Sequence, residues 1–530
     1  MVLDKDVEVP MRDGAVLRAN VFRPEAKGKF PVLMTLGPYG KDVHIQQFMP
    51  EAWEYLVKRQ PAVLQASSCK YLAFETPDPE CWVPDGYVVV RVDSRGAGKS
   101  GGKLDVNSPA EFRDFYDAIE WAGAQPWSNG SVGLLGISYF AAGQWNVASL
   151  RPPHLAAILP WQGTPDYYDG RTRQGGIFSS GFTNRWWNRS VLRCPFADIV
   201  TGERNTGPAS FTPAELQANR VDYYAAILAH PLNDAWYHER SPRYENIEIP
   251  ALVVANWGGL GLHLRGTIEG YSHIASREKW LKVQSGSYFA TFLAPENVAL
   301  QKGFFDRYLK GLDNGWEKEP KVEVAIRAPG DTVKRSITGT RWPLSDTQWM
   351  RLYLDAESRS LGAAAPKRAA IKAHLWVSST TDDMDIFATL RAFDPQGNEL
   401  TFFSATEPKA PVSQGWLRVS HRKLDPERST EYLPWHTHDE AQMLKPGEAY
   451  PVDLCIWPAS LALPAGYRLE LVLQGKDFER AGEPGLQKGS GFFLHDDPVD
   501  RPPARFAGTN TIHTGEGRES YLLLPVLPAQ

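Results

Sequence analysis

A serine at position 138 stands between an aliphatic run and an alanine-rich segment, in SVGLLGISYFAAG (131–143). The aliphatic residues predict a strand and the residues after Ser138 predict a helix. A sharp turn between such a strand and helix exposes the hydroxyl and aims the helix N-terminus at it, as nucleophilic serines require. Of the usual G-x-S-x-G pattern, Gly136 is present and Phe140 replaces the second glycine. Ser138 is thus a candidate nucleophile, with a buried serine at a helix start as the alternative.

The elements around this serine predict an α/β protein of two or three domains. Short Val/Leu/Ile runs alternate with helical patterns through residues 1–160 and again through 246–317, which is typical of a parallel sheet covered on both faces. Residues 161–245 are aromatic and polar and predict a helical cap over a pocket. From 318 to 530, strand patterns separated by Pro, Gly and Asp turns predict an antiparallel β-sandwich.

Composition points to a small-molecule ligand. The 530 residues carry a net charge of −5, too mild to indicate a nucleic-acid partner or an anionic membrane surface. The N-terminus MVLDKDVEVPMRDG has no apolar leader and no long apolar stretch occurs, so we expect neither export nor membrane spanning. Four scattered cysteines, Cys69, Cys81, Cys194 and Cys455, fit a reducing compartment, and we expect a cytoplasmic protein.

Neither a nucleotide cofactor nor a metal ion is expected. DSRGAGKSGG (93–102) has G-x-G-x-x-G spacing and a Gly-Lys-Ser run, but Asp93 stands where a phosphate loop needs glycine, and no helix follows. His436 and His438 have the spacing of metal ligands without a clear third ligand, which favours a surface loop. The acidic segment TTDDMDIF (380–387) is interpreted as a solvated turn.

Several motifs resemble one family along nearly the whole chain. PVLMTLGPYGK (31–41), DSRGAGKSGG, QPWSNGSVGLLGISY (125–139), FFDRYLKGLDNGW (304–316) and the closing GTNTIHTGEGRESYLLLPVLP together resemble the CocE/NonD hydrolases, which comprise esterases and X-Pro dipeptidyl-peptidases. The resemblance implies an α/β-hydrolase core, an inserted helical cap and a C-terminal jelly roll. It also implies that Ser138 attacks a carbonyl whose oxygen is held by the Tyr39 hydroxyl and the Tyr139 N–H. The family's self-association makes a homo-oligomer possible.

The usual proton acceptor is missing. The family's acid position aligns with Gly259 and its histidine with Gln284, and glutamine cannot accept a proton. Three explanations remain open: another base such as His263 replaces it; Ser138 is not a nucleophile, and the oxyanion site polarises a carbonyl while Gln284 or Tyr288 orients the substrate; or the protein only binds.

The sequence therefore supports two enzymatic hypotheses and one binding hypothesis. The first is a hydrolase that acts on an ester or amide carbonyl of a small hydrophobic molecule. The second is a non-hydrolytic cyclase, lyase or isomerase on the same scaffold, and the third is an inactive binding protein. The candidates for pocket-lining aromatic side chains are Trp161, Trp187 and Trp257, together with Trp186, Tyr167 and Tyr168. Packing between helices explains the aromatic residues of the cap equally well.

Overall fold

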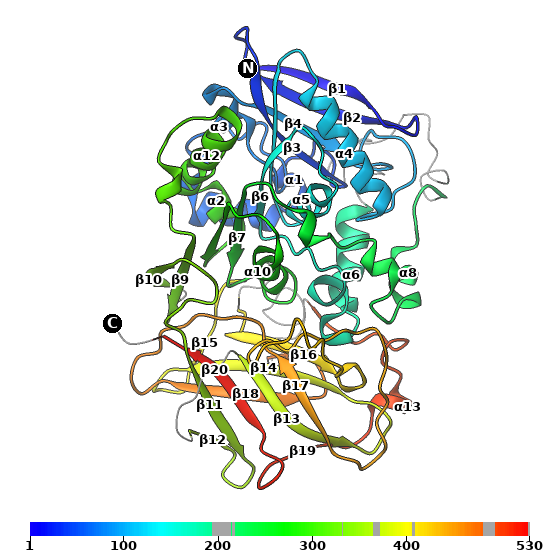
Figure 1. Cartoon of the computed structure of the whole chain (residues 1–530), viewed down its shortest axis with the longest axis vertical. Coiled ribbons are helices and arrows are strands. Elements are labelled where there is room, and N and C mark those ends of the chain that lie inside the picture. The colour runs from blue at the N-terminus through cyan, green and yellow to red at the C-terminus, as the bar shows by residue number, and fades with distance from the viewer. Residues whose placement is uncertain are drawn as a thin grey trace.

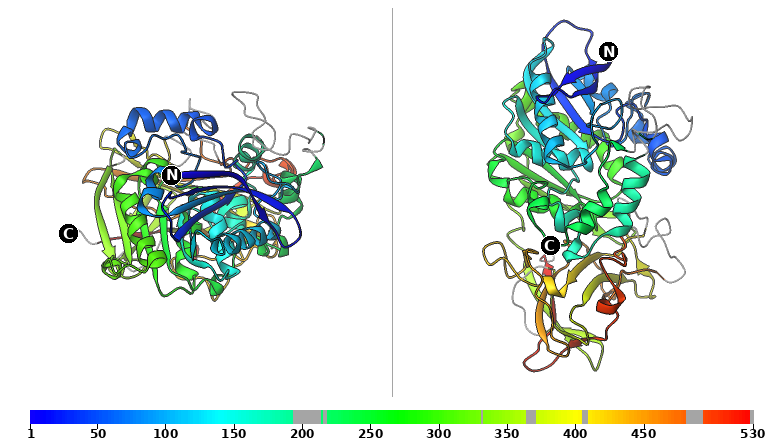
Figure 2. Two further views of the ribbon diagram at one scale, coloured as in Figure 1. Left: turned by 90° about the horizontal axis from the view of Figure 1, so that it is seen from above. Right: turned by 90° about the vertical axis from the view of Figure 1, so that its right-hand side faces the viewer.

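The chain forms two lobes, an α/β lobe and an all-β lobe, in a computed structural model (Figures 1 and 2). The structure describes residues 1–192, 214, 218–330, 332–363, 371–404, 409–480 and 493–527. Cys194 and the middle of the predicted cap therefore lie outside the described residues. The lobes stack along the long axis of the molecule, with the sandwich below the α/β lobe in Figure 1.

The α/β lobe is built on a ten-stranded sheet in the order β1-β2-β4-β3-β5-β6-β7-β8-β9-β10. The strands from β4 and β3 through to β9 run parallel, and β1, β2 and β10 add antiparallel edges. The bounds are β1 Val2–Pro10, β2 Val16–Arg23, β3 Phe30–Gly37, β4 Val88–Asp93, β5 Ser128–Ile137, β6 Leu155–Trp161, β7 Ala251–Asn256, β8 Lys279–Gln284, β9 Val322–Ala328 and β10 Thr332–Gly339.

Helices cover both faces of this sheet because its central strands are apolar on both sides. Neighbouring residues of β3 point to opposite faces: Leu33 packs with Phe305, whereas Val32 packs with Phe115. The predicted doubly covered α/β-hydrolase core is confirmed. On the Phe115 face lie α4 Pro109–Gly123, α5 Tyr139–Ser149 and α10 Leu264–His273; on the other lie α2 Pro50–Arg59, α3 Pro79–Trp82, α11 Tyr288–Leu293 and α12 Pro295–Lys310, with the short α1 Ile45–Phe48 before α2.

The described part of the cap connects β6 to β7. Its regular helices are α6 Ser180–Arg185, α8 Tyr223–Ala229 and α9 Ala235–His238. Figure 1 places α6 and α8 beside the sandwich. The cap therefore contacts both lobes and brings its aromatic residues toward the carboxyl ends of the parallel strands, where ligands bind in open α/β sheets.

The core sheet extends further along the chain than the sequence indicated. We predicted the sandwich to begin at residue 318, but β9 pairs parallel with β8, and β10 pairs antiparallel with β9. An apolar strand pattern shows that a segment is extended and half-buried, but it does not show which sheet the strand joins. The linker to the second lobe therefore follows β10.

The second lobe is an antiparallel β-sandwich, as predicted. One sheet has the order β12-β11-β20-β13-β17 with β19 beside β13, and the other has β15-β14-β16 with β18 beside β14. Their inner faces share one hydrophobic cluster, which includes Leu375 and Leu390. The bounds are β11 Gln348–Asp355, β12 Ser360–Ala363, β13 Lys372–Ser379, β14 Asp385–Phe393, β15 Glu399–Leu400, β16 Ser413–Arg418, β17 Tyr450–Cys455, β18 Arg468–Gln474, α13 Pro503–Phe506, β19 Asn510–His513 and β20 Tyr521–Val526.

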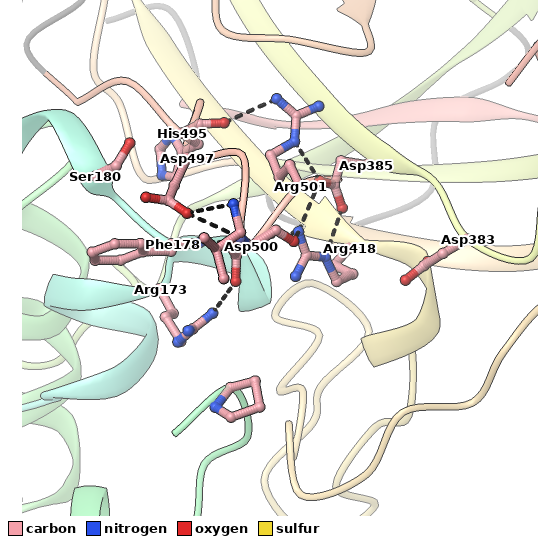
Figure 3. Close-up of polar contacts among 12 residues, drawn as sticks. Arg173, Phe178, Ser180, Asp383, Asp385, Arg418, His495, Asp497, Asp500 and Arg501 are labelled. Atoms are coloured by element: carbon pink, nitrogen blue, oxygen red, sulfur yellow. Dashed lines mark hydrogen bonds and ion pairs between the residues drawn. The ribbon is translucent and has the colours of Figure 1, made fainter. Parts of the chain in front are cut away.

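A buried ion-pair network joins the cap to the sandwich (Figure 3). Arg418 makes two hydrogen bonds to Asp385, at 3.0 and 3.1 Å, and a third, at 3.0 Å, to Asp500. Asp500 also accepts a 2.6 Å bond from Arg173 of the cap, and Arg501 donates to Asp385 at 2.8 Å. The interpretation of the acidic segment as a solvated turn was wrong for Asp383 and Asp385, which are buried because arginine and serine groups fold over them.

Replacing Arg418 by methionine should destabilise the protein strongly. The variant leaves Asp385 and Asp500 buried with one arginine partner fewer each, and breaking a buried ion pair costs about 3–5 kcal/mol of unfolding free energy. Calorimetric thermal unfolding should show a clearly lower midpoint. The matched control is Lys423→Met, since Lys423 makes an exposed ion pair with Asp439 in the same lobe and its loss should leave the midpoint nearly unchanged.

The two histidines with metal-ligand spacing are buried, so the prediction of a surface loop was also wrong for them. His438 lies 3.2 Å from His421, measured between their Nδ1 atoms, and 3.8 Å from Asp169 of the cap segment. The packing of the two lobes buries this loop. Among the described residues, no group of three or more His, Cys, Asp or Glu side chains is placed to hold a metal ion, and no described helix combines the length and apolarity needed to span a bilayer.

Candidate active site

Ser138 occupies a strained turn between β5 and α5. Its backbone has φ 56° and ψ −111°, a conformation that non-glycine residues adopt at a cost of about 1–3 kcal/mol. The Ser138 N–H donates to the Trp161 carbonyl of β6 at 3.2 Å, and the Ser138 carbonyl accepts from Ala142 at 2.8 Å to start the helix. The residues on either side are buried whereas Ser138 is only half-buried, so the turn presents its side chain.

Phe140 replaces the second glycine of the motif because two other glycines make room for it. A Cβ at Gly37 would lie 2.5 Å from the Phe140 ring, and one at Gly136 would lie 2.6 Å from the Phe140 Cβ. The close approach of helix and strand shifts along by one residue, since a Cβ at Gly163 would meet Ala141 at 2.4 Å. The turn is therefore preserved without the second glycine.

The tyrosine expected to hold an oxyanion lies beside this turn. Tyr39 follows β3, and its ring packs edge-on against the rings of Tyr139 and Phe140, each at 5.7 Å between centroids. Its hydroxyl accepts a 2.7 Å hydrogen bond from the Trp186 indole of the cap. Because the oxygen accepts this bond, the Tyr39 hydroxyl hydrogen points elsewhere, and polarisation by the indole makes it a stronger donor.

Tyr139 contributes its backbone N–H to the oxyanion site, because its hydroxyl is held by other groups. Its hydroxyl donates to buried Glu111 at 2.5 Å and accepts from the Asn107 N–H at 3.0 Å, which holds the side chain away from Ser138. Glu111 is itself bonded to Ser94 at 2.6 Å, and burial raises its pKa to about 7. The Tyr139 N–H at the start of α5 remains beside the serine, where an oxyanion donor is needed.

A glutamate that sequence reasoning missed lies next to Ser138. Glu75 is 4% exposed and has a left-handed backbone, with φ 60°. Its carbonyl accepts the Ile137 N–H at 3.0 Å, and its Oε1 accepts the Tyr288 hydroxyl at 3.0 Å. Its Oε2 is buried without full hydrogen-bond geometry to any described residue, although the Ser138 hydroxyl and the Tyr139 N–H lie close enough to act on the carboxyl. The Glu75 carboxyl therefore borders both the nucleophile candidate and an oxyanion donor.

Burial sets the protonation of Glu75. Desolvation raises its pKa well above the ordinary value, and the Tyr288 and Ser138 hydroxyls, the Arg171 cation and the Tyr139 N–H reverse only part of that shift. Burial therefore favours the protonated form of the carboxyl, which ionises as the pH rises through the raised pKa. A carboxyl with such a raised pKa is a typical proton-transfer group in enzymes.

Gln284 and His263, the other two side chains considered for this role, have different surroundings from Glu75. Gln284, at the end of β8, donates its amide to Asn297 at 2.8 Å. His263, just before α10, is buried, and burial together with the nearby Arg171 cation lowers its pKa to about 3. No described hydrogen bond joins either side chain to Ser138. At Gly259, the predicted acid position, a Cβ would lie 3.1 Å from the Leu264 nitrogen in a tight turn.

The aromatic candidates divide between the two faces of the sheet. Trp161 and Trp187 belong to the hydrophobic cluster that contains Tyr39 and Tyr139, and Trp186, Tyr167, Tyr168 and Tyr288 belong to the same cluster. Trp257 belongs to the other cluster and donates its indole N–H to the Ala325 carbonyl at 2.6 Å. Its role is to join β7 to β9, so it does not line the site.

Two segments of the chain match models of known protein families. Residues 13–288, more than half of the chain, match the family model of X-Pro dipeptidyl-peptidase (S15 family). The chain belongs to this S15 family. Residues 368–523 match the C-terminal non-catalytic domain of X-Pro dipeptidyl-peptidases, which corresponds to the sandwich. The family is one of serine esterases and peptidases, and the resemblance seen in the motifs is confirmed.

Individual members of the S15 family are similar over most of the chain. A crystal structure of a CocE/NonD family hydrolase from Staphylococcus aureus is 34% identical, with a TM-score of 0.86 over 100% of this chain and 94% of that one. Cocaine esterase from a Rhodococcus species is 28% identical over 66% of this chain and 62% of its own length. A putative serine esterase from Mycobacterium bovis is 22% identical over 88% and 90%.

Proposed function

We propose that the protein is a serine hydrolase that transfers the acyl group of an ester or amide to Ser138 and then to water. The observation that carries this proposal is the buried Glu75 carboxyl beside a half-buried serine in a strained strand-to-helix turn. A carboxylate in that position supplies the base that Gly259 and Gln284 do not.

The first half-reaction uses Glu75 twice. In its ionised form Glu75 takes the Ser138 proton while Oγ bonds to the carbonyl carbon, and the carbonyl oxygen becomes an oxyanion. The Tyr39 hydroxyl and the Tyr139 N–H stabilise this charge. The Tyr139 N–H therefore turns from the Glu75 carboxyl to the substrate oxygen when the substrate binds. Glu75 then gives its proton to the leaving oxygen or nitrogen, and the carbonyl re-forms as an ester of Ser138. Water then attacks the carbonyl of this ester while Glu75 takes a proton from the water. Glu75 returns the proton to Ser138 Oγ as the carboxylic acid product leaves.

Tyr288 positions the base. Its hydroxyl donates to Glu75 Oε1, which leaves Oε2 for the serine, and the Tyr288 ring packs on Phe289 at 4.1 Å between centroids. We predicted that Tyr288 orients the substrate. Its hydrogen bond to Glu75 instead supports a role in positioning the base. The surrounding aromatic cluster suits a small hydrophobic substrate.

A second candidate function rests on the raised pKa of Glu75. A protonated carboxyl donates a hydrogen bond, and beside Tyr39 it would polarise a substrate carbonyl without covalent chemistry. The protein would then be a non-hydrolytic cyclase, lyase or isomerase in which Ser138 forms no bond to the substrate.

A reactive fluorophosphonate separates the two candidates. The wild-type protein should gain the mass of one phosphonyl group, because activated serines attack phosphorus, and Ser138→Ala should gain none. Intact-mass spectrometry measures both. Equal labelling of wild type and variant, or no labelling of a folded wild-type protein, would contradict the assignment of Ser138 as an activated nucleophile and favour the second candidate.

A further inference from the structure

In the described part of the chain, one buried arginine differs from the other buried arginines because no polar group pairs with its guanidinium. Among the described residues, the buried arginines are Arg91, Arg171, Arg173, Arg240, Arg265, Arg327 and Arg418. Six of them bind carboxylates or backbone carbonyls through the guanidinium. No hydrogen bond or ion pair joins the Arg171 guanidinium to any described residue, and its buried Nε has no partner. An unpaired buried charge is costly, so its presence calls for a ligand.

The surroundings of Arg171 place this charge at the candidate active site. The guanidinium carbon lies 4.6 Å from the ring centroid of Trp186, 5.6 Å from that of Tyr167 and 5.7 Å from that of Tyr139. Trp186 is the residue that bonds to the Tyr39 hydroxyl, and Tyr139 directly follows Ser138. The Arg171 charge also acts on both Glu75 and His263. The faces of these rings cover the guanidinium by cation–π contact, and a ring face is not a hydrogen-bond acceptor of the kind that a carboxylate or carbonyl oxygen provides.

The neighbouring titratable groups do not neutralise Arg171. The pKa of His263 is lowered to about 3, so its imidazole is neutral at ordinary pH, and burial raises the pKa of Glu75, which favours its protonated form. Burial raises the pKa of Tyr139 and of Tyr167 well above the ordinary value, so both are neutral phenols. The described groups around Arg171 therefore leave its positive charge uncompensated, in a site surrounded by aromatic rings. The planar guanidinium fork carries five N–H donors, and a carboxylate accepts two parallel hydrogen bonds from such a fork.

We propose that Arg171 binds a carboxylate group of the substrate, so the natural substrate is an anionic molecule with an apolar body rather than a neutral ester or amide. This inference rests on the proposed function only in taking the anion to be part of the substrate. The carboxylate pairs with the guanidinium, the apolar body lies along Trp186 and Tyr139, and the reacting carbonyl faces Ser138 and Tyr39.

A matched pair of probes that differ only in charge tests this proposal. 4-Phenylbutyrate and 4-phenylbutanamide are titrated into the Ser138→Ala protein by isothermal calorimetry, a background in which nothing turns over. Charge-assisted bidentate hydrogen bonds predict that the carboxylate binds about tenfold tighter than the amide, or more. A carboxylate that binds no better than the amide, or does not bind at millimolar concentration, overturns the proposal.

Variants of Arg171 assign the effect to this residue. Arg171→Met in the same background should abolish the preference for the carboxylate, and Arg171→Lys should keep part of it because the charge remains without the fork. Because the Arg171 guanidinium has no polar partner among the residues that the structure describes, its loss leaves none of them unpaired, and the methionine variant should unfold at a temperature no lower than the Ser138→Ala parent. Arg189→Met is the matched control, since Arg189 is an exposed cap arginine and its loss should change nothing. A preference that survives Arg171→Met places the anion elsewhere and overturns the assignment.

The two proposals fail separately in these experiments. Binding to Ser138→Ala does not need a nucleophile, so a carboxylate preference in a protein that fluorophosphonate does not label would support the anion site and contradict hydrolysis. Turnover of neutral 4-nitrophenyl esters without any carboxylate preference would support hydrolysis and contradict the anion site.

Discussion

Replacing Ser138 by alanine should lower kcat/KM for a 4-nitrophenyl ester by about 10³-fold or more. The hydroxyl forms the covalent bond in the proposed mechanism, and removing the nucleophile of a serine hydrolase leaves only the rate that the oxyanion donors and substrate binding provide. Initial rates of nitrophenolate release, measured for both proteins at the same protein concentration, give the ratio directly.

Ser149→Ala is the control for this change. Ser149 lies on the same helix, and its hydroxyl donates a hydrogen bond of 2.7 Å to the Asn146 carbonyl. Because this bond does not involve the site, loss of the hydroxyl should leave the rate unchanged. If Ser138→Ala retains full turnover of the natural substrate, the covalent mechanism is contradicted and the non-hydrolytic candidate is supported, because Tyr39 and Glu75 would then polarise a carbonyl without the serine.

Local patterns predicted the scaffold and its serine turn well. The run Val88 to Val92 is buried on both faces as a central parallel strand must be, and the strand, serine and helix around residue 138 form the expected turn. Tyr39 came from the resemblance, and the structure places it beside Tyr139. These features depend on a few consecutive residues, and the types and spacing of those residues are enough to predict them.

Contacts between distant segments could not be predicted in the same way. Glu75 lies in YLAFETPDPE (71–80), a loop without any motif, and it reaches Ser138 only because its carbonyl binds Ile137 and its side chain binds Tyr288. Arg171 likewise stands in an aromatic stretch with no pattern of its own. The same limit explains His438, whose burial results from the packing of the two lobes.

Replacing Glu75 by glutamine should lower kcat/KM by about 10²- to 10⁴-fold, the usual contribution of a general base. Glutamine keeps the size and the hydrogen bond from Tyr288 but cannot accept the serine proton. In the wild type, burial raises the pKa of Glu75, so kcat/KM should rise with pH as the carboxyl ionises, and this rise should be absent from the variant. A pH–rate profile of both proteins measures it, with Glu80→Gln as a control, because the half-buried Glu80 carboxylate bonds to Ser67 and Ser68 and not to Ser138.

The same substitution should stabilise the protein at neutral and alkaline pH. Folded Glu75 retains a proton that the unfolded chain loses above about pH 4.5, so the free energy of unfolding of the wild type falls as the pH rises from there through the raised pKa. Glutamine removes this dependence, and thermal midpoints at several pH values should show the variant gaining on the wild type as the pH rises. Loss of activity together with a gain in stability would mark Glu75 as a group that is kept for chemistry. If Glu75→Gln instead retains most of the activity, and wild-type activity falls as the carboxyl ionises, then Glu75 acts as a hydrogen-bond donor to a carbonyl, since an amide replaces a donor but not a base.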